Sequence, residues 1–373
     1  MPPTLDQITA QATRFRDRLD ALKESLASET IDWYPFDTIG TFCLLGKFLS
    51  GERRDLLRIL GQGPVLDLCC GDGDLSFFLE TLGCKLHSVD WPVTNMNFMR
   101  GVRRMKEALR SRVEIHALDL DSRFLLPAQF YTAAFFFGAL YHLKNPFYVL
   151  EKLADHAHYC FLSTRIAKYM PDRRTLVQGF PVAYLVGPEE LNNDCSNYWI
   201  FSEAGLHRIL TRANWEVCDW ASFGAAKYSD PVHPEADERA YCLLRSRSLA
   251  GSQTVTLGPG WHELEHDAWR WTERRFSLTV SGASEQHRKL LLRFSLLPSL
   301  APLVITVSVN GVRLPAQVFR EPGECFYAAF LPSPAATNHI ECELDHALAP
   351  DGADLRERGV IVRTADLKTV LSA

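Results

Sequence analysis

The sequence predicts an α/β protein with a doubly wound, mostly parallel sheet, followed by a C-terminal β-sandwich domain. Short apolar runs alternate with helical patterns between residues 61 and 247, and a glycine-containing turn follows the first run. From residue 248, short candidate strands are separated by Gly, Pro and Asn-Gly turns. Because 373 residues exceed what one core organises, we expect a helical cap over 1–60 and domains over 61–247 and 248–373.

The cap prediction depends on apolar positions that recur every three or four residues near the N-terminus. These positions are Leu5, Ile8, Ala12, Phe15, Leu19, Leu22 and Leu26. A second helical stretch, from about residue 51 to 60, ends at the turn-forming sequence Gly61-Gln62-Gly63-Pro64. We expect these helices to cover one side of the following domain.

The central region alternates strands with helices, which favours a parallel sheet. The predicted strands are Val65–Cys69, Lys85–Asp90, Val113–Leu118, Thr132–Phe137, His158–Ser163, Trp215–Trp220 and Ala240–Arg245. The predicted helices cover about 75–81, 96–109, 146–154 and 203–213. The strongly apolar run over 132–137 is typical of a strand buried on both faces.

The C-terminal region has strand-like runs and no long amphipathic pattern, so we expect a β-sandwich there. Asn310-Gly311 is a strong hairpin signal. Trp261, Trp269 and Trp271 fall within a short span. Flat aromatic faces beside polar groups can form a platform for a glycan, and they can equally fill a core.

Composition narrows the compartments and partners. The formal net charge of −5 gives no general attraction for phosphate backbones, which weighs against nucleic acid as a partner without excluding it. The N-terminus resembles neither a secretory nor an organellar signal, so we expect a cytoplasmic protein, and no apolar run is long enough for a membrane span. Ten cysteines without a C-x-x-C pair favour free thiols, and we assign no metal ligands and no oligomeric state.

A nucleotide-type site is predicted where the first strand meets its helix, in the segment Val65-Leu66-Asp67-Leu68-Cys69-Cys70-Gly71-Asp72-Gly73. The dinucleotide motif G-x-G-x-x-G is incomplete here, and an acid precedes the turn, so a neutral or cationic ligand suits it better than a pyrophosphate. Asp90 closes the second strand, where its carboxylate can accept hydrogen bonds from two ribose hydroxyls. The pattern predicts a Rossmann-like domain.

Together these elements resemble the cofactor motifs of class I S-adenosylmethionine-dependent methyltransferases, over roughly residues 33 to 247. The resemblance implies S-adenosyl-L-methionine as the cofactor, with Asp67 facing its methionine part and Gly71 and Gly73 giving close backbone approach. Cys69 stands where the family usually has glycine, so the turn can differ slightly in backbone geometry. Asp119, after the third strand, matches the position near the adenine, with Asp121 as a competitor and a solvated loop acid as the plain alternative.

The fourth strand leads into Gly138-Ala139-Leu140-Tyr141-His142-Leu143-Lys144-Asn145-Pro146. This segment resembles the L-Y-H stretch of the bacterial wobble-uridine tRNA carboxymethyltransferases and of similar methyltransferases. His142 can act as a general base, because an imidazole titrates near neutral pH. Tyr141 and His142 can equally shape the methionine pocket, because methyl transfer from a sulfonium often needs mainly positioning and desolvation.

The resemblance also implies a substrate-facing loop at Asn197–Ser202, which makes Tyr198 a candidate substrate-binding residue, with Trp199 and Phe201 as possible core residues. Arg165 is a second candidate, although a surface salt bridge is the commoner role of such an arginine. The carboxymethyltransferases bind the extra carboxylate of their cofactor with basic and phenolic groups. Here Asp194, Cys195 and Ser196 precede Tyr198, so a neutral methyl group is favoured.

Three functions follow from these features. The first is methyl transfer from S-adenosylmethionine to an oxygen, nitrogen or carbon of a small molecule or glycan. The second is modification of a tRNA wobble uridine, which the acidic net charge and the missing loop cation disfavour. The third is a non-catalytic protein whose β-rich domain binds a glycan or a partner while the α/β domain serves as a scaffold.

Overall fold

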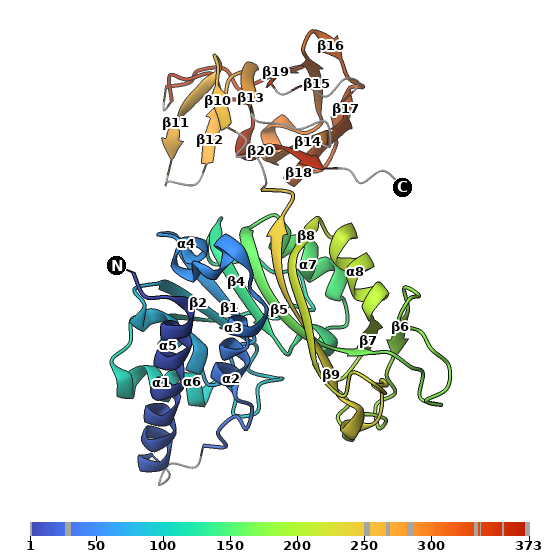
Figure 1. Ribbon diagram of the computed structural model, residues 1–373. Coiled ribbons are helices and arrows are strands. Elements are labelled where there is room, and N and C mark those ends of the chain that lie inside the picture. Colours follow the sequence, from blue (N-terminus) through green and yellow to red (C-terminus); the bar gives the residue numbers. More distant parts are fainter. Residues whose placement is uncertain are drawn as a thin grey trace. The chain divides into compact units, whose positions relative to one another are not determined.

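The computed structural model describes residues 2–26, 31–249, 254–265, 269–281, 287–331, 335, 337–352 and 354–369. The chain divides into two compact units, Met1–Arg247 and Ser248–Ala373 (Figure 1). The first unit contains helices and a mixed sheet, whereas the second is built from antiparallel strands.

The first unit begins with helices and then alternates strands with helices. Its helices are α1 (Leu5–Ser25), α2 (Thr38–Cys43), α3 (Leu45–Phe48), η1 (Gly51–Arg54), α4 (Leu56–Leu60), α5 (Asp74–Thr81), α6 (Arg100–Leu109), η2 (Leu140–His142), α7 (Pro146–Ala154), α8 (Glu203–Arg212) and η3 (Pro234–Ala236). Its strands are β1 (Pro64–Leu68), β2 (Lys85–Asp90), β3 (Glu114–Ala117), β4 (Tyr131–Phe137), β5 (Ala157–Ala167), β6 (Ala183–Leu185), β7 (Trp199–Ser202), β8 (Trp215–Gly224) and β9 (Glu238–Ser246).

The sheet order places a topological switch point between β1 and β4. Strands β3, β2, β1, β4 and β5 are neighbours in that order and run parallel. Strand β9 pairs antiparallel with β5, and β8 pairs antiparallel with β9. Ligands of open α/β sheets bind at the carboxyl ends of the strands beside such a switch point.

Both faces of this sheet are covered, because neighbouring residues of one strand belong to different cores. Val65 and Phe135 pack with α1, α5 and α6, whereas Leu66 and Phe136 pack with α7 and α8. The α/β prediction is therefore confirmed, and the sheet is mixed because β8 and β9 run against their neighbours.

The N-terminal helices lie on the α5 side of the sheet. Helix α1 begins at a capping box in which Thr4 and Gln7 satisfy each other's backbone N–H groups. Its buried residues, including Leu5 and Ile8, join the core that contains α5. The short helices α2 and α3 were missed because their apolar residues are too few to show a period.

The expectation of a loop at Asn197–Ser202 is wrong for its last four residues. Trp199–Ser202 forms β7, which pairs in parallel with the end of β5 through Ile166 and Phe201. Strand β5 runs on to Ala167, four residues beyond the predicted end at Ser163, and so offers a free edge past the end of β4. Strand β6 then adds to β7 in the antiparallel sense.

The second unit consists of two antiparallel sheets. One contains β10 (Thr254–Leu257), β13 (Arg275–Ser281), β19 (Thr337–Leu344), β15 (Leu303–Val309), β16 (Val312–Arg313) and β17 (Gln317–Phe319). The other contains β11 (Trp261–Glu265), β12 (Trp269–Thr272), β20 (Ile361–Thr369), β14 (His287–Leu296) and β18 (Gly323–Phe330), and η4 (Pro298–Leu300) follows β14.

Residues of both sheets, such as Val307 and Phe294, share one buried cluster. The predicted hairpin at Asn310-Gly311 is confirmed, since both residues have positive φ and connect β15 to β16. Trp261 packs against the cluster, and its indole N–H donates to the Ser277 carbonyl at 2.7 Å. The Trp261 side chain therefore takes part in the internal packing of the second unit.

All ten cysteines are free thiols, as the sequence predicts, and Cys160 and Cys242 are buried. Within the described ranges, no helix is both long and apolar enough to cross a membrane.

Replacing Trp215 with Phe tests the packing of α7 on the sheet. Trp215 is fully buried and its indole N–H donates to the Leu150 carbonyl at 2.9 Å. Loss of this bond and of core volume should lower the free energy of unfolding by about 2 kcal/mol, measured by urea denaturation. The control is Trp199→Phe, because Trp199 is only half-buried and donates similarly to Lys144. An equal loss of unfolding free energy in the two variants would contradict the conclusion that Trp215 is the core residue of the two.

Candidate functional site

The turn between β1 and α5 uses backbone conformations that glycine adopts freely. Gly71 and Gly73 have φ values of 58° and 80°. A Cβ at Gly73 would lie 2.7 Å from Val102 of α6, and one at Gly71 would lie 3.3 Å from the Tyr34 ring. Both glycines therefore allow close packing of neighbouring elements around the turn.

Cys69 occupies the position where the resemblance implies glycine, and its φ of 55° is in the left-handed region. A residue with a Cβ is strained in that conformation. Burial raises the pKa of the Cys69 thiol, and the nearby charges of Asp90 and Asp67 raise it further. The thiol is therefore protonated, and it packs against the core below the turn.

Asp90, at the end of β2, fixes the position of the turn. Its Oδ2 accepts hydrogen bonds from Gly71 N at 2.9 Å and from Asn95 Nδ2 at 3.0 Å. Its Oδ1 accepts one from Trp91 N at 2.7 Å. An ionised carboxylate has about four acceptor positions, so these bonds leave one on Oδ1. By this count one acceptor position remains for a further donor.

Asp72 ties the same turn to the N-terminal segment. Its carboxylate accepts from Tyr34 N at 2.7 Å and from Asn97 Nδ2 at 2.8 Å, and Lys23 Nζ lies 3.4 Å away. Asp72 is buried, whereas Tyr34 is half-buried with its ring over Gly71. Sequence reasoning missed Asp72 and Tyr34. The only signals in the sequence were the position of Asp72 between the two glycines and the position of Tyr34 before Pro35.

Asp67 lies beneath the turn with its carboxylate turned toward α5. Its Oδ2 accepts the Ser76 hydroxyl at 2.6 Å, and the Ser76 and Ser88 hydroxyls are also 2.6 Å apart. Burial raises the pKa of Asp67 to about 7, against the lowering effect of the Ser76 bond, and the charge of Asp90 raises it further. Near neutral pH this carboxyl is thus poised between its two protonation states.

Carboxylates outnumber cations around this turn. Asp67, Asp72, Asp74 and Asp90 are all buried or nearly so, and Lys23 pairs with Asp74 at 2.8 Å. Such a field favours a cationic ligand and disfavours phosphates. An adenosyl sulfonium fits this set of carboxylate acceptors, because it offers positive charge together with ribose hydroxyls that donate. In the part of the chain that the structure describes, no group of three or more His, Cys, Asp or Glu side chains could hold a metal.

The two acids after β3 differ in what they bind. Asp121 Oδ1 accepts from Lys144 N at 2.8 Å and Asn145 N at 3.2 Å, and so links this loop to the segment after η2. Asp119 is half-buried, and its Oδ1 accepts from Asp121 N at 3.0 Å. Asp119 therefore keeps more of its accepting capacity, as a ligand-binding role near an adenine would require.

The segment after β4 brings Tyr141 and His142 to the carboxyl edge of the sheet. Gly138 turns the chain with a φ of 66°, and its N–H donates to the Ser163 carbonyl on β5 at 2.9 Å. The Tyr141 and His142 rings have centroids 4.2 Å apart. The Tyr141 carbonyl accepts from Tyr198 N at 2.8 Å, so Tyr198 joins this group through its backbone.

His142 contacts the loop before β7. Its Nδ1 lies 3.1 Å from the Ser196 carbonyl oxygen and 3.0 Å from Ser196 Oγ, which donates to Asp194. Burial lowers the pKa of His142, whereas the Ser196 bond and the Asp194 charge raise it less strongly. The imidazole is therefore neutral near pH 7. This pairing could not be predicted from the sequence, because His142 and Ser196 are far apart along the chain.

Arg239, at the start of β9, lies on the other side of Tyr141. Its Nη1 donates to the Tyr141 hydroxyl at 3.3 Å, and its guanidinium lies 5.6 Å from the ring centroid. Its Nε donates to Asp237 at 3.0 Å, and the side chain is half-buried. Sequence reasoning missed this cation, because Arg239 precedes the predicted start of the last strand.

Arg165, predicted as a substrate-binding cation, is instead bonded inside the unit. It is 3% exposed, and its Nη2 donates to the carbonyls of Asp230 at 3.0 Å and His233 at 2.6 Å. Burial lowers the pKa of Arg165, partly offset by the Asp237 charge. The geometry gives Arg165 a structural role, and Arg239 is the more accessible of these two arginines.

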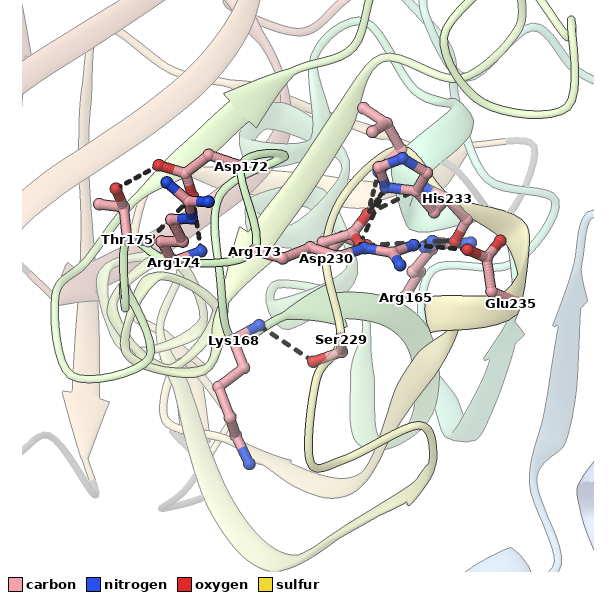
Figure 2. A network of polar contacts seen from close by, with 11 residues as sticks. Arg165, Lys168, Asp172, Arg173, Arg174, Thr175, Ser229, Asp230, His233 and Glu235 are labelled. Carbon is pink, nitrogen blue, oxygen red and sulfur yellow. Dashed lines mark hydrogen bonds and ion pairs between the residues drawn. The ribbon is translucent and has the colours of Figure 1, made fainter.

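Arg165 belongs to a polar network that joins the segment after β5 to the one before β9 (Figure 2). Asp230 is fully buried and accepts from Arg173 Nε at 2.8 Å and from His233 N at 2.8 Å. Lys168 N donates to Ser229 Oγ at 3.0 Å. These bonds hold two long connections together at the carboxyl end of β5.

A shallow hollow of about 330 Å³ lies elsewhere on this unit. Its lining comes from α7, α8, β6, β7 and the two residues before β6, and comprises Phe147, Pro181, Val182, Ala183, Phe201, Gly205, Arg208, Ile209 and Arg212. Phe201, from the predicted substrate-facing segment Asn197–Ser202, lines it, but none of the residues predicted to bind the cofactor or to act in catalysis does. The hydrogen-bond geometry at the glycine turn, rather than this hollow, defines the candidate site.

Comparison with known proteins found similar solved structures only. No protein-family model matches the chain, and no curated protein matches it significantly. The N-terminal domain of EvdMO1 with SAH bound is 16% identical, covers 61% of this chain and 96% of its own, and has a TM-score of 0.41. The [4+2]-cyclase SpnF is 15% identical. Its match covers 65% of this chain and 97% of SpnF, with a TM-score of 0.38.

An S-adenosylmethionine-dependent methyltransferase from Mesorhizobium loti is 12% identical, covers 52% of this chain and 98% of its own, and has a TM-score of 0.38. Similarity at this level assigns neither an activity nor a ligand to the chain.

Two substitutions of Cys69 test the strain in the turn. Cys69→Gly and Cys69→Ala both remove the thiol, but only glycine relieves the left-handed backbone. We expect the glycine variant to be more stable than the alanine variant by about 1 kcal/mol in urea denaturation. Equal stabilities, or a more stable alanine variant, would show that the turn is not strained at this residue.

Proposed function

We propose that the α/β unit is an S-adenosyl-L-methionine-dependent methyltransferase that acts on a small molecule or a glycan. In this proposal Asp67, Cys69, Gly71, Gly73, Asp90 and Asp119 surround the cofactor, and Tyr141, His142 and Tyr198 face the acceptor. The second unit then serves as a β-sandwich accessory domain.

The observation that carries the proposal is the Asp90 carboxylate, held beside Gly71 by three N–H donors with one acceptor position left. A ribose hydroxyl is the donor that this position suits. The surrounding carboxylates stabilise a sulfonium and an ammonium group at the same edge. A dinucleotide would bring its pyrophosphate into this negative field, which disfavours it.

The residues of the acceptor side position the reaction and exclude water. S-adenosylmethionine, when bound, supplies an activated methyl group, so the protein has mainly to align the acceptor with it. Tyr141 is 8% exposed and is fixed by Arg239 and by the backbone of Tyr198. A fixed phenol next to the neutral His142 gives a partly dry surface for the acceptor.

The tRNA alternative, with a carboxylated cofactor, has less support. At the loop where a cation for the extra carboxylate is expected, Ser196 is bonded to Asp194 and His142. Asp194 would repel the extra carboxylate. Among the described residues no contact specifically favours the third function, binding without catalysis, and Trp261 is engaged in packing.

Calorimetry with S-adenosylhomocysteine (SAH) tests the proposal. The native chain should bind SAH, and Asp90→Asn should bind it at least about tenfold more weakly, because a hydrogen bond to a charged acceptor is lost. Asp20→Asn, an exposed carboxylate on α1, is the matched control and should not change the affinity. Circular dichroism establishes that each variant is folded. No heat and no thermal stabilisation with the native chain at saturating SAH would refute the proposal.

The pKa of Asp67 gives a second test. Below pH 7 its carboxyl is neutral, and above pH 7 its charge attracts the sulfonium, so the affinity for S-adenosylmethionine should rise about three- to tenfold between pH 6 and 8. SAH lacks the sulfonium charge and should show a weaker dependence. In Asp67→Asn, the affinities for the two ligands should depend on pH to the same extent. A native pH profile identical for both ligands would contradict the role of Asp67.

A further inference from the structure

His142 and the loop before β7 carry an inference that rests on the proposed function and names the class of acceptor. Ser196 Oγ donates to Asp194 Oδ1 at 2.6 Å, and Ser196 N donates to the same oxygen at 2.9 Å. Both Ser196 oxygens lie within 3.1 Å of His142 Nδ1. The three residues therefore form a continuous chain of hydrogen bonds from a carboxylate to an imidazole.

The direction of these bonds sets the tautomer of His142. The single hydroxyl proton of Ser196 points to Asp194, so both Ser196 oxygens act as acceptors toward the ring. Nδ1 must then carry the ring proton, and the lone pair of the neutral imidazole is on Nε2. Among the described residues Nε2 has no hydrogen-bond partner, and it is not one of the buried polar atoms left unsatisfied. Its lone pair is therefore available.

The charged groups around His142 keep it neutral before the reaction. Burial lowers its pKa, the Ser196 carbonyl and the Asp194 charge raise it, and Arg239 lowers it. The Tyr141 ring packs against it at 4.2 Å between centroids. A neutral imidazole with a free Nε2, turned and held by Ser196, is the form that accepts a proton.

We propose that His142 Nε2 is the base for a hydroxyl acceptor, so that the reaction is O-methylation, with Ser196 and Asp194 as positioning residues. The acceptor oxygen forms its bond to the methyl carbon as the carbon–sulfur bond breaks. That electron pair stays on sulfur, and the hydroxyl proton passes to Nε2. The imidazolium formed is stabilised through Nδ1 by Ser196 and Asp194, and it then releases the proton to solvent.

A hydroxyl is the acceptor that such a base helps most. Alcohols and most phenols are almost wholly protonated at neutral pH, and their oxygen attacks well only as the proton leaves. A thiol ionises to a useful extent by itself. A neutral amine attacks with its own lone pair and can lose its proton afterwards.

Nuclear magnetic resonance of the full chain labelled with ¹⁵N-histidine tests the hydrogen-bond chain directly, with His142→Gln to assign the signal. We expect a proton on Nδ1 in the native protein. Asp194→Asn should lower the measured pKa of His142 by about half a unit, since a nearby negative charge is removed. Glu189→Gln, an exposed carboxylate of the same connection, should leave it unchanged. A proton on Nε2, or a pKa that Asp194→Asn does not move, would overturn the proposal.

Methyl transfer to phenols, sugars and their thiol and amine analogues tests the acceptor class. His142→Gln should slow transfer to hydroxyls by about 100-fold or more while transfer to thiols changes little. Ser196→Ala should slow hydroxyl transfer and raise its dependence on pH, and Ser196→Thr, which keeps the hydroxyl, should restore it. Preferred transfer to amines or thiols, or a full hydroxyl rate in His142→Gln, would overturn the proposal.

These outcomes are distinguishable from failure of the proposed function. SAH calorimetry with the native chain and with His142→Gln should give affinities within about twofold, because His142 is placed on the acceptor side. Absence of SAH binding to the native chain refutes the methyltransferase itself. Normal SAH binding with the wrong tautomer refutes only the role given to His142, Ser196 and Asp194.

Discussion

The candidate site depends on one carboxylate at the end of β2. Asp90 accepts from the backbone of Gly71 and Trp91 and from the Asn95 side chain, so it fixes the glycine turn and the following segment at once. Charge-assisted bonds from backbone N–H groups are among the stronger hydrogen bonds in proteins. Burial raises the pKa of Asp90, and these bonds act against that rise. The negative field at the sheet edge follows from this arrangement.

A second set of bonds extends the same constraint to the N-terminal helices. Asp72 binds Tyr34 and Asn97, and Lys23 on α1 pairs with both Asp72 and Asp74. The buried charges are costly to leave unpaired, so α1 and the segment at Tyr34 are held over the turn. In this way the N-terminal residues take part in forming the site and do more than cover one face of the sheet.

Much of the fold could be predicted because short local residue patterns mark the strands and helices. The run Lys85–Asp90 coincides with β2, and the apolar run before Gly138 is β4 with one residue added. Strand β7 could not be predicted, since Trp199–Ser202 becomes a strand only by pairing with the free end of β5. Short segments whose structure is set by distant partners carry too little periodicity to be recognised.

The site likewise contains residues that local sequence patterns predict and residues that only distant strand pairing brings together. Asp67, Gly71, Gly73 and Asp90 stand close to β1 and β2 in sequence, so strand ends and turn chemistry predict that they meet. The pairing of His142 with Ser196 joins the ends of different strands and depends on how β7 docks. Tyr34 and Arg239 were missed for the same reason. Arg165 was misjudged because burial and backbone carbonyl partners cannot be read from its position after an apolar run.

The most direct test of the account is a crystal structure of the full chain soaked with S-adenosylhomocysteine. The account predicts a ribose hydroxyl within hydrogen-bond distance of Asp90 Oδ1, the adenine near Asp119, and the sulfur on the side of Tyr141 and His142. Ligand density at any other place on the α/β unit, or an empty glycine turn at saturating ligand, would contradict it.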